Sequence, residues 1–264
     1  MQRCTEADRQ AVLDYIAAEP EINLFIYGDV ETVGVDKPPV QVWVEPGPQG
    51  WDFLVLQYFD SYILYSRNPD YNAAAAAAFL RDRKVRGISG KQELLDRLAP
   101  YFPGKSCKLT YMSRCNAVDP AYAGQTPVGI TVRELGPEDL DQTLDLLRGI
   151  EEFADSYHGD AREREELAQC WKCGGMMMGA FRAGQLVSTA QTTAASSRSA
   201  MVVGVATRPE ARGCGYASAV VAELCRRSFA QGRAFLCLFY DNPAAGRIYH
   251  RIGFSEVGGW TMMN

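Results

Sequence analysis

Two glycines stand where a helix is predicted to begin, in the stretch "RPEARGCGYASAVV" from Arg208 to Val221. The residues after Gly215 have an apolar stripe at helical spacing, and the preceding run "SAMVVGVAT" is typical of a strand. The first turn of a helix has unpaired backbone N–H groups and a partial positive charge, so it can bind an anion. Glycines at 213 and 215 would let the anion approach without a Cβ in the way. The stretch therefore predicts a phosphate-binding loop between a strand and a helix.

Strands and helices are predicted on both sides of this loop. Before it, "GITVREL" indicates a strand, "PEDLDQTLDLLRGIEEF" and "REREELAQCWKC" indicate helices, and residues 174–207 indicate three antiparallel strands with a hairpin turn at Ala183 and Gly184. After it, "AFLCLFY" is a continuous apolar run, as expected of a strand buried on both faces. "NPAAGRIYHRIGF" predicts a helix that Asn242 caps and Gly253 ends, before a last strand. The second half is therefore predicted to be an α+β domain.

The chain is expected to contain two domains joined near its middle. The segment "AVDPAYAGQTPV", from Ala117 to Val128, is rich in Pro, Gly and Ala and has no helical or strand periodicity, which favours a linker. The first half is also mixed. Strands are expected in "VQVWVEP", "WDFLVLQYFDSYILYS", "VRGIS" and "CKLTYMSRC", and helices in "NAAAAAAFLRDR" and "KQELLDRLAPYF". We expect domains at 1–118 and 128–264, with a linker at 119–127.

Composition excludes several classes of protein. The formal net charge of −5 and the pI near 5.2 argue against a general nucleic-acid binder. No apolar run approaches the roughly 18 residues that a membrane-spanning helix needs, and the first residues have no secretion signal. The eight cysteines are scattered, as expected of reduced and mostly buried thiols. These features favour a cytoplasmic protein, a monomer or a homodimer, that binds neither membranes nor nucleic acid.

Two motifs together resemble the GNAT superfamily of N-acetyltransferases. "RGCGYA", from Arg212 to Ala217, matches the R/Q-x-x-G-x-G/A loop that binds acetyl-CoA in that family. "NPAAGRIYHRIGF" matches the N-x-x-A-x-x-x-Y-x-x-x-G-F segment of the family. The resemblance covers about residues 128–264. The first half has a similar run of elements without the phosphate loop, so the chain looks like a tandem GNAT protein (FR47-like) with a degenerate N-terminal copy.

The resemblance implies a GNAT fold, a three-layer α+β arrangement with a mixed central sheet, and acetyl-CoA as cosubstrate without a metal. It also implies transfer of the acetyl group to a primary amine, on a small molecule or a peptide, by direct attack. Gly204 interrupts its strand, which suits a bulge; in the family this strand splays from the next and its backbone binds the pantetheine arm. The implied cofactor-binding residues are Val205, Ala206, Thr207, Arg212, Gly213, Cys214, Gly215, Tyr216, Ala217, Ser218, Asn242, Ala245 and Tyr249.

The catalytic groups are less completely specified. In the family, the tyrosine that matches Tyr249 protonates the leaving thiolate. Packing of an aromatic side chain in an amphipathic helix would also account for a tyrosine at this position. Many family members have a general-base glutamate on the strand before the phosphate loop, and "SAMVVGVAT" has none. An acceptor amine must lose a proton before it attacks, so the nearest candidates for a base are Glu152 and His158, with Glu151 and Asp155 beside them. A base acting through water would leave no trace in the sequence.

Other interpretations of the same residues remain. A dinucleotide fingerprint requires the glycines almost directly after the strand, and "TRPEAR" intervenes here. Cys170 and Cys173 have the spacing of half a zinc site, but no second pair follows, which favours buried thiols on one face of a helix. Capping alone would account for Asn242. A non-catalytic sensor or scaffold that binds acyl-CoA is the alternative function, which the missing strand glutamate favours and Tyr249 opposes.

Overall fold

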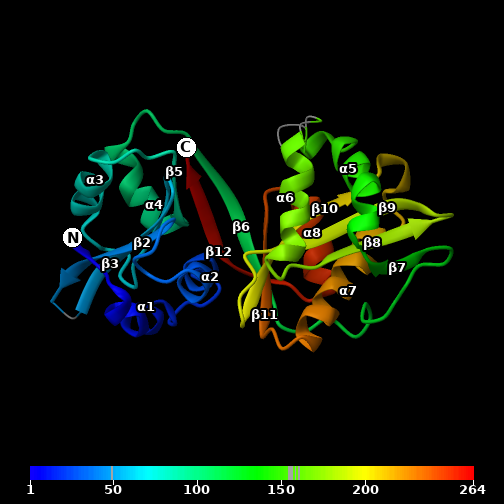
Figure 1. The fold of residues 1–264 in the computed structure, drawn as a ribbon, viewed down its shortest axis with the longest axis horizontal. Coiled ribbons are helices and arrows are strands. Elements are labelled where there is room, and N and C mark those ends of the chain that lie inside the picture. Colours follow the sequence, from blue (N-terminus) through cyan, green and yellow to red (C-terminus); the bar gives the residue numbers. More distant parts are fainter. Residues whose placement is uncertain (49, 154–156, 158, 160) are drawn as a thin grey trace. The chain divides into compact units, whose positions relative to one another are not determined.

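The computed structural model describes residues 1–264 except 49, 154–156, 158 and 160. The chain forms two units: unit 1 consists of Met1–Met112 and Glu256–Asn264, and unit 2 of Ser113–Ser255 (Figure 1). This division differs from the expected one at both ends of the second domain. Unit 2 begins at Ser113 and includes the segment 119–127 that was expected to be a linker, and the end of the chain belongs to unit 1. The physical reason is strand pairing: β12 (Ser255–Met263) pairs antiparallel with β5 (Gly87–Lys91) from Trp260–Lys91 to Met263–Ile88.

Unit 1 is a mixed sheet with helices packed against it. Its strands lie in the order β1-β2-β3-β4-β5-β12-β6. The strands of the first half are β1 (Gln2–Arg3), β2 (Val40–Gly47), β3 (Gly50–Tyr58), β4 (Ser61–Tyr65) and β6 (Cys107–Cys115), and the helices are α1 (Arg9–Ile16), α2 (Leu24–Thr32), α3 (Ala73–Arg81) and α4 (Gln92–Leu98). Phe53 and Val55 of β3 pack in one cluster with Ala76 and Ala77 of α3. Within the alanine run at 73–78, Ala73, Ala76 and Ala77 are therefore the packing face of the helix, and Ala74 and Ala78 are exposed.

Unit 2 contains the predicted second half. Its strands lie in the order β11-β10-β9-β8-β7, with the end of β6 beside β11. The elements are β7 (Thr131–Glu134), α5 (Leu140–Arg148), α6 (Ala161–Lys172), β8 (Met177–Arg182), β9 (Gln185–Thr193), β10 (Ser199–Thr207), α7 (Tyr216–Ala230), β11 (Phe235–Tyr240) and α8 (Pro243–Ile252). The predicted hairpin joins β8 to β9, and both of its turn residues have positive φ, 49° at Ala183 and 81° at Gly184.

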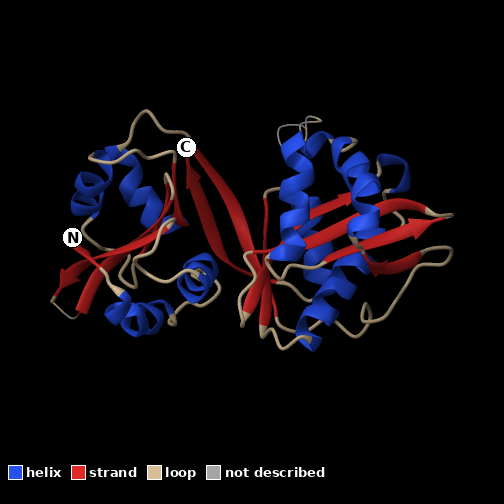
Figure 2. Ribbon diagram, viewed as in Figure 1, coloured by secondary structure: helices blue, strands red, loops and turns tan. Residues whose placement is uncertain are grey.

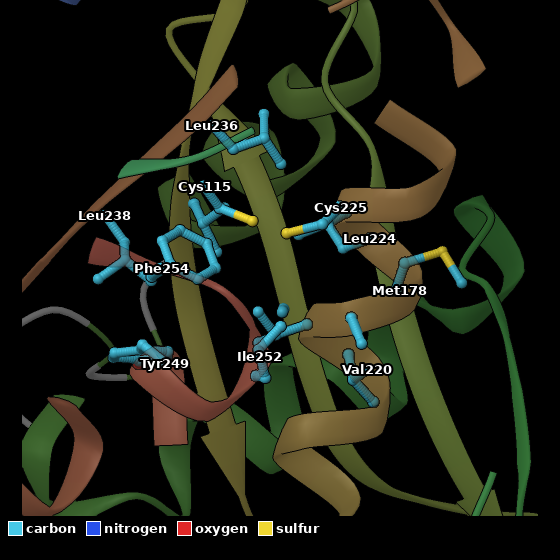
Figure 3. Close-up of a cluster of buried hydrophobic side chains, with 14 of the residues drawn as sticks. Cys115, Met178, Val220, Leu224, Cys225, Leu236, Leu238, Tyr249, Ile252 and Phe254 are labelled. Carbon is cyan, nitrogen blue, oxygen red and sulfur yellow. The ribbon is translucent and has the colours of Figure 1, made fainter. Parts of the chain in front are cut away.

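The sheet of unit 2 is covered on both faces (Figure 2). Because side chains alternate along a strand, Met178 and Ala180 of β8 pack with α7 and α8, whereas Met177 and Phe181 pack with α5 and α6. In the first cluster, Val220 and Leu224 of α7 lie near Ile252 of α8 (Figure 3). The expected three-layer α+β fold is confirmed.

The two halves of the sequence repeat one order of elements. The first runs strand, helix, helix, three strands, helix, strand, helix, strand from β1 to β6, and the second repeats it from β7 to β12. In the first half, α3 follows β4 as α7 follows β10 in the second. This repeat agrees with the tandem arrangement expected from the sequence.

Candidate functional site

The predicted phosphate loop lies between β10 and α7. A short 3-10 helix, Pro209–Ala211, follows β10 and leads through Arg212 to the two glycines. Gly213 has φ of 78°, and Gly215, the N-cap of α7, has φ of 79°, a region that side chains with a Cβ disfavour. A Cβ on Gly213 would meet nothing within 4 Å, so its glycine serves the backbone turn and keeps the space in front of α7 open.

Strand β10 loses its pairing with β11 before this loop, while it stays paired with β9 as far as Thr207. It pairs in parallel with β11 from Ser199–Phe235 to Val202–Leu238, and its register with β9 shifts between Val203 and Ala206. Gly204 lies in this shift with φ of 60°, and a Cβ there would come within 3.0 Å of the Gln191 amide nitrogen. The expected bulge is confirmed, and β10 beyond Val202 no longer pairs with β11 in the register described.

The splayed strands and the loop line one cleft with a volume of about 1000 Å³. Twelve of the thirteen residues predicted to bind the cofactor are among its lining residues: Val205, Ala206, Thr207, Arg212, Gly213, Gly215, Tyr216, Ala217, Ser218, Asn242, Ala245 and Tyr249. The exception is Cys214, whose side chain is exposed and whose sulfur lies 3.7 Å from the carbonyl oxygen of Arg212. Residues about 45 positions apart in sequence therefore meet around one space large enough for a sizeable ligand.

The guanidinium of Arg212 lies in this cleft and has a carboxylate partner. Its Nη2 is 3.2 Å from Oε2 of Glu152, and its Nε donates to the carbonyl oxygen of Thr207 at 3.3 Å. Hydrogen bonds from its own backbone N–H and then from Arg212 lower the pKa of the Glu152 carboxyl. A carboxylate with a lowered pKa and a cationic partner is a weaker proton acceptor. The geometry thus favours Glu152 as a partner of the loop over Glu152 as a base.

Tyr249 lies on α8 at the inner wall of the cleft. It is 8% exposed, and its ring packs against that of Tyr240 at a centroid distance of 6.1 Å. The ring of Phe254 is its other aromatic contact, at a centroid distance of 6.0 Å (Figure 3). Burial raises the pKa of its hydroxyl to about 12. The group is therefore a neutral phenol at physiological pH, able to donate a hydrogen bond and unable to act as a base.

Of the other predicted site residues, Asn242 is described by the structure and His158 is not. Asn242 caps α8, since its Oδ1 accepts a hydrogen bond from the backbone N–H of Ala244 at 2.8 Å, and it also lines the cleft. Its contact with a cofactor stays a prediction. His158 lies outside the described residues, as does Asp155.

The predicted linker contributes to the cleft, which the sequence did not suggest. Ala121, Tyr122, Gln125, Thr126 and Pro127 line it, and the backbone N–H of Asp119 donates to the carbonyl oxygen of Ile252 at 2.8 Å. A signal was present at Gly253, the predicted end of α8. A Cβ there would lie 2.5 Å from the carbonyl oxygen of Ala117, so this glycine allows the linker to approach the helix.

Unit 1 has a different structure at the equivalent position before α3. Residues 66–72, "SRNPDYN", contain no glycine. The backbone N–H of Asn72 donates to Oδ2 of Asp52 at 2.8 Å, and Oδ1 of Asn72 accepts from Ala75 N–H at 3.0 Å. Backbone N–H groups at the N-terminus of α3 are thus hydrogen-bonded by the protein's own carboxylate and amide. The N-terminus of α7, by contrast, opens into a cleft.

The eight cysteines are free thiols that differ in burial. Four of the eight thiols are buried, Cys170 is partly buried, and Cys107, Cys173 and Cys214 are exposed, so the expectation of mostly buried thiols was wrong for Cys173 in particular. Burial raises the pKa of Cys170 to about 11. Within the described part of the chain, no group of three or more His, Cys, Asp or Glu side chains could hold a metal ion. None of the helices described is both long and apolar enough to cross a membrane.

Known proteins share this architecture. Residues 131–257 match the family model described as "Acetyltransferase (GNAT) domain". A Drosophila protein of known structure superposes with a TM-score of 0.68 at 14% identity, over 100% of this chain and 98% of its own. A GCN5-related N-acetyltransferase from Sphaerobacter thermophilus gives 0.67 at 17% identity, over 99% and 93%.

A protein described as a tandem GNAT protein from the clavulanic acid biosynthesis pathway gives a TM-score of 0.57 at 13% identity, over 99% of this chain and 96% of its own. At these identities the structural likeness shows the fold alone. No curated protein matches the chain. Residues 131–257 of this chain are therefore identified as an acetyltransferase domain of the GNAT family.

Proposed function

We propose that unit 2 transfers an acetyl group from acetyl-CoA to a primary amine, on a small molecule or a peptide. The observation that supports this most strongly is the convergence of three features on one cleft: the open N-terminus of α7, the unpaired edge of β10 and the phenol of Tyr249. The match of residues 131–257 to the GNAT domain supports acetyl transfer in general, and the cleft is the site that we propose for it.

The residues of the cleft fit coenzyme A part by part. Backbone N–H groups at the start of α7 and the Arg212 guanidinium would hold the pyrophosphate, because both present positive charge to the same open space. The β10 backbone from Gly204 to Thr207 would hydrogen-bond the amide-rich pantetheine arm, since it lines the cleft where pairing with β11 has ended.

Direct attack of the amine on the thioester needs alignment and charge stabilisation. Two reactants held in line gain from proximity, and a backbone N–H of β10 would stabilise the developing oxyanion. Tyr249 would donate a hydrogen bond to the departing thiolate. Complete proton transfer from a phenol of pKa about 12 to a thiolate of pKa about 8.5 costs roughly 5 kcal/mol. A hydrogen bond that stabilises the thiolate is therefore the larger part of its role.

The proton of the acceptor amine would leave through water. Strand β10 has no glutamate, and the carboxylate of Glu152 is paired with Arg212. An amine can lose its proton to solvent before it attacks, at a rate that rises with pH toward the amine's own pKa. The alternative function is a sensor that binds acyl-CoA without turnover. It would use the same cleft but would not catalyse acetyl transfer.

A thermal-shift titration with acetyl-CoA, CoA and NAD tests the proposed ligand. Binding to the native state alone at 100 times the dissociation constant stabilises a protein by about 2.7 kcal/mol. Gly215→Glu should abolish the shift, because it places a negative charge in the loop. Gly184→Glu is the matched control: its φ of 81° is similar, but it lies in the β8–β9 turn and outside the cleft.

Stabilisation of the wild type and the Gly184 variant by both CoA ligands, with loss in the Gly215 variant, supports the proposal. Stabilisation by NAD alone, or by none of the three, contradicts it. Tyr249→Phe then separates the two functions. An enzyme should lose turnover of an amine panel by tenfold or more and keep its affinity for acetyl-CoA, whereas absence of turnover in the wild type would leave only the sensor.

A further inference from the structure

We propose that the segment 119–127 is the wall of the cleft that receives the nucleotide end of coenzyme A, and that Arg251 selects the 3′-phosphate of that nucleotide. This inference rests on the proposed function and extends it to a specificity that the two sequence motifs do not cover. It predicts a preference for CoA over 3′-dephospho-CoA.

The segment is fixed at both ends of the cleft. At one end, Asp119 N–H bonds the last carbonyl of α8 at Ile252, and Gly253 provides the space for that contact. At the other end, Cγ of Pro127 lies 3.8 Å from where a Cβ of Gly215 would stand, which places it against the phosphate loop. The segment therefore runs from the end of α8 to the start of α7, along the open side of the cleft.

The side chains along this path suit a nucleotide. Tyr122 is half-buried, packs against the buried cluster that contains Ile252 and lines the cleft, so it offers an aromatic side chain held by packing. Gln125 and Thr126 line the cleft beside it and offer hydrogen-bonding groups. A ligand whose pyrophosphate lies at Gly213 to Ser218 would extend its nucleoside past Pro127 toward these side chains.

Arg251 supplies a positive charge on the facing helix. It lines the cleft from the last turn of α8, three residues after Ile248, which also lines it. Its Nε donates to the backbone carbonyl oxygen of Arg247 at 3.1 Å, a contact that neutralises none of its charge. Arg212 belongs to the loop that would hold the pyrophosphate, so a second arginine in the same cleft fits a second phosphate group. The 3′-phosphate is the group that distinguishes CoA from 3′-dephospho-CoA.

Calorimetric titration of CoA and 3′-dephospho-CoA into three proteins tests the assignment. The wild type should bind CoA more tightly by up to about fivefold, the upper end of the range for a partly exposed charge pair. Arg251→Gln should reduce CoA affinity to that of 3′-dephospho-CoA and leave the latter unchanged. Arg247→Gln is the control, because it removes the same charge from the same helix at an exposed residue outside the cleft lining.

The outcomes separate this inference from the proposed function. Equal affinities of the wild type for the two ligands, or an equal loss of both in the Arg251 variant, would overturn the role of Arg251. A preference lost equally in the Arg247 variant would show a general field of α8 and overturn it too. Failure of the wild type to bind either ligand would instead contradict the proposed function itself.

Discussion

Replacing Glu152 with glutamine should tighten the binding of coenzyme A. The carboxylate of Glu152 lies 3.2 Å from the Arg212 guanidinium, in the position that a pyrophosphate bound by the loop would compete for. The ligand must displace this carboxylate or accept its repulsion. Glutamine keeps the size of the side chain and removes the charge, so the cost of displacement falls.

The size of the effect follows from exposure. The side chains of Arg212 and Glu152 are 49% and 57% exposed, so the pair is solvated. Ion pairs of this kind contribute about 0.2–1 kcal/mol, which corresponds to about a 1.4- to 5-fold gain in affinity. The gain should shrink in high salt, because screening weakens an exposed pair.

Calorimetry with CoA measures this gain, and Glu151→Gln is the control because it removes the same charge from the adjacent exposed residue. Affinity of the Glu152 variant equal to or weaker than that of the Glu151 variant would refute the reasoning. The acetylation rate of the same variant addresses the other hypothesis, since a general base at Glu152 requires the rate to fall by orders of magnitude.

Three further predictions concern stability, each measured by urea unfolding. Leu147→Ala should cost about 2–5 kcal/mol, because Leu147 is 1% exposed in the core beneath α5; a loss below 1 kcal/mol would contradict that packing. Gly246→Ala should destabilise the protein by about 1 kcal/mol, because the new Cβ would lie 2.5 Å from Tyr240 Cε2 and this overpacking outweighs the gain in helix propensity. A variant more stable than the wild type would show that the Tyr240 ring moves aside freely. Asp139→Asn should cost about 2 kcal/mol of stability at neutral pH, because hydrogen bonds from Arg133 lower the pKa of Asp139 in the folded protein. This stabilisation is present above the pKa of the unfolded state and is lost as pH falls through the lower pKa of the folded state. The stabilities of variant and wild type should therefore converge in acid, and a constant difference down to pH 2 would contradict the assignment.

Most elements could be predicted from the sequence because their causes are local. The strand "CKLTYMSRC" is β6 without change of boundary, and the helix "REREELAQCWKC" is α6 to within a residue at each end. Helix α2 shows where this approach fails. Its buried residues Leu24, Ile26, Gly28 and Val30 alternate as in a strand, and its aromatic, β-branched and glycine residues have weak helix propensity. Burial in the folded unit stabilises it as a helix.

The sequence by itself determined the turn with two glycines before α7, twelve of the residues that line the cleft and the match to the GNAT domain. Glycines at positive φ, a helix start and an apolar period are properties of short segments. Only the tertiary structure decided that the segment 119–127 lines the cleft, that Glu152 pairs with Arg212 and that the last strand belongs to unit 1. These depend on which distant segments become neighbours. An irregular segment with few apolar residues, such as 119–127, has no hydrophobic periodicity from which its packing partner could be predicted. An exposed carboxylate such as that of Glu152 can pair with any cationic side chain that the fold brings near it.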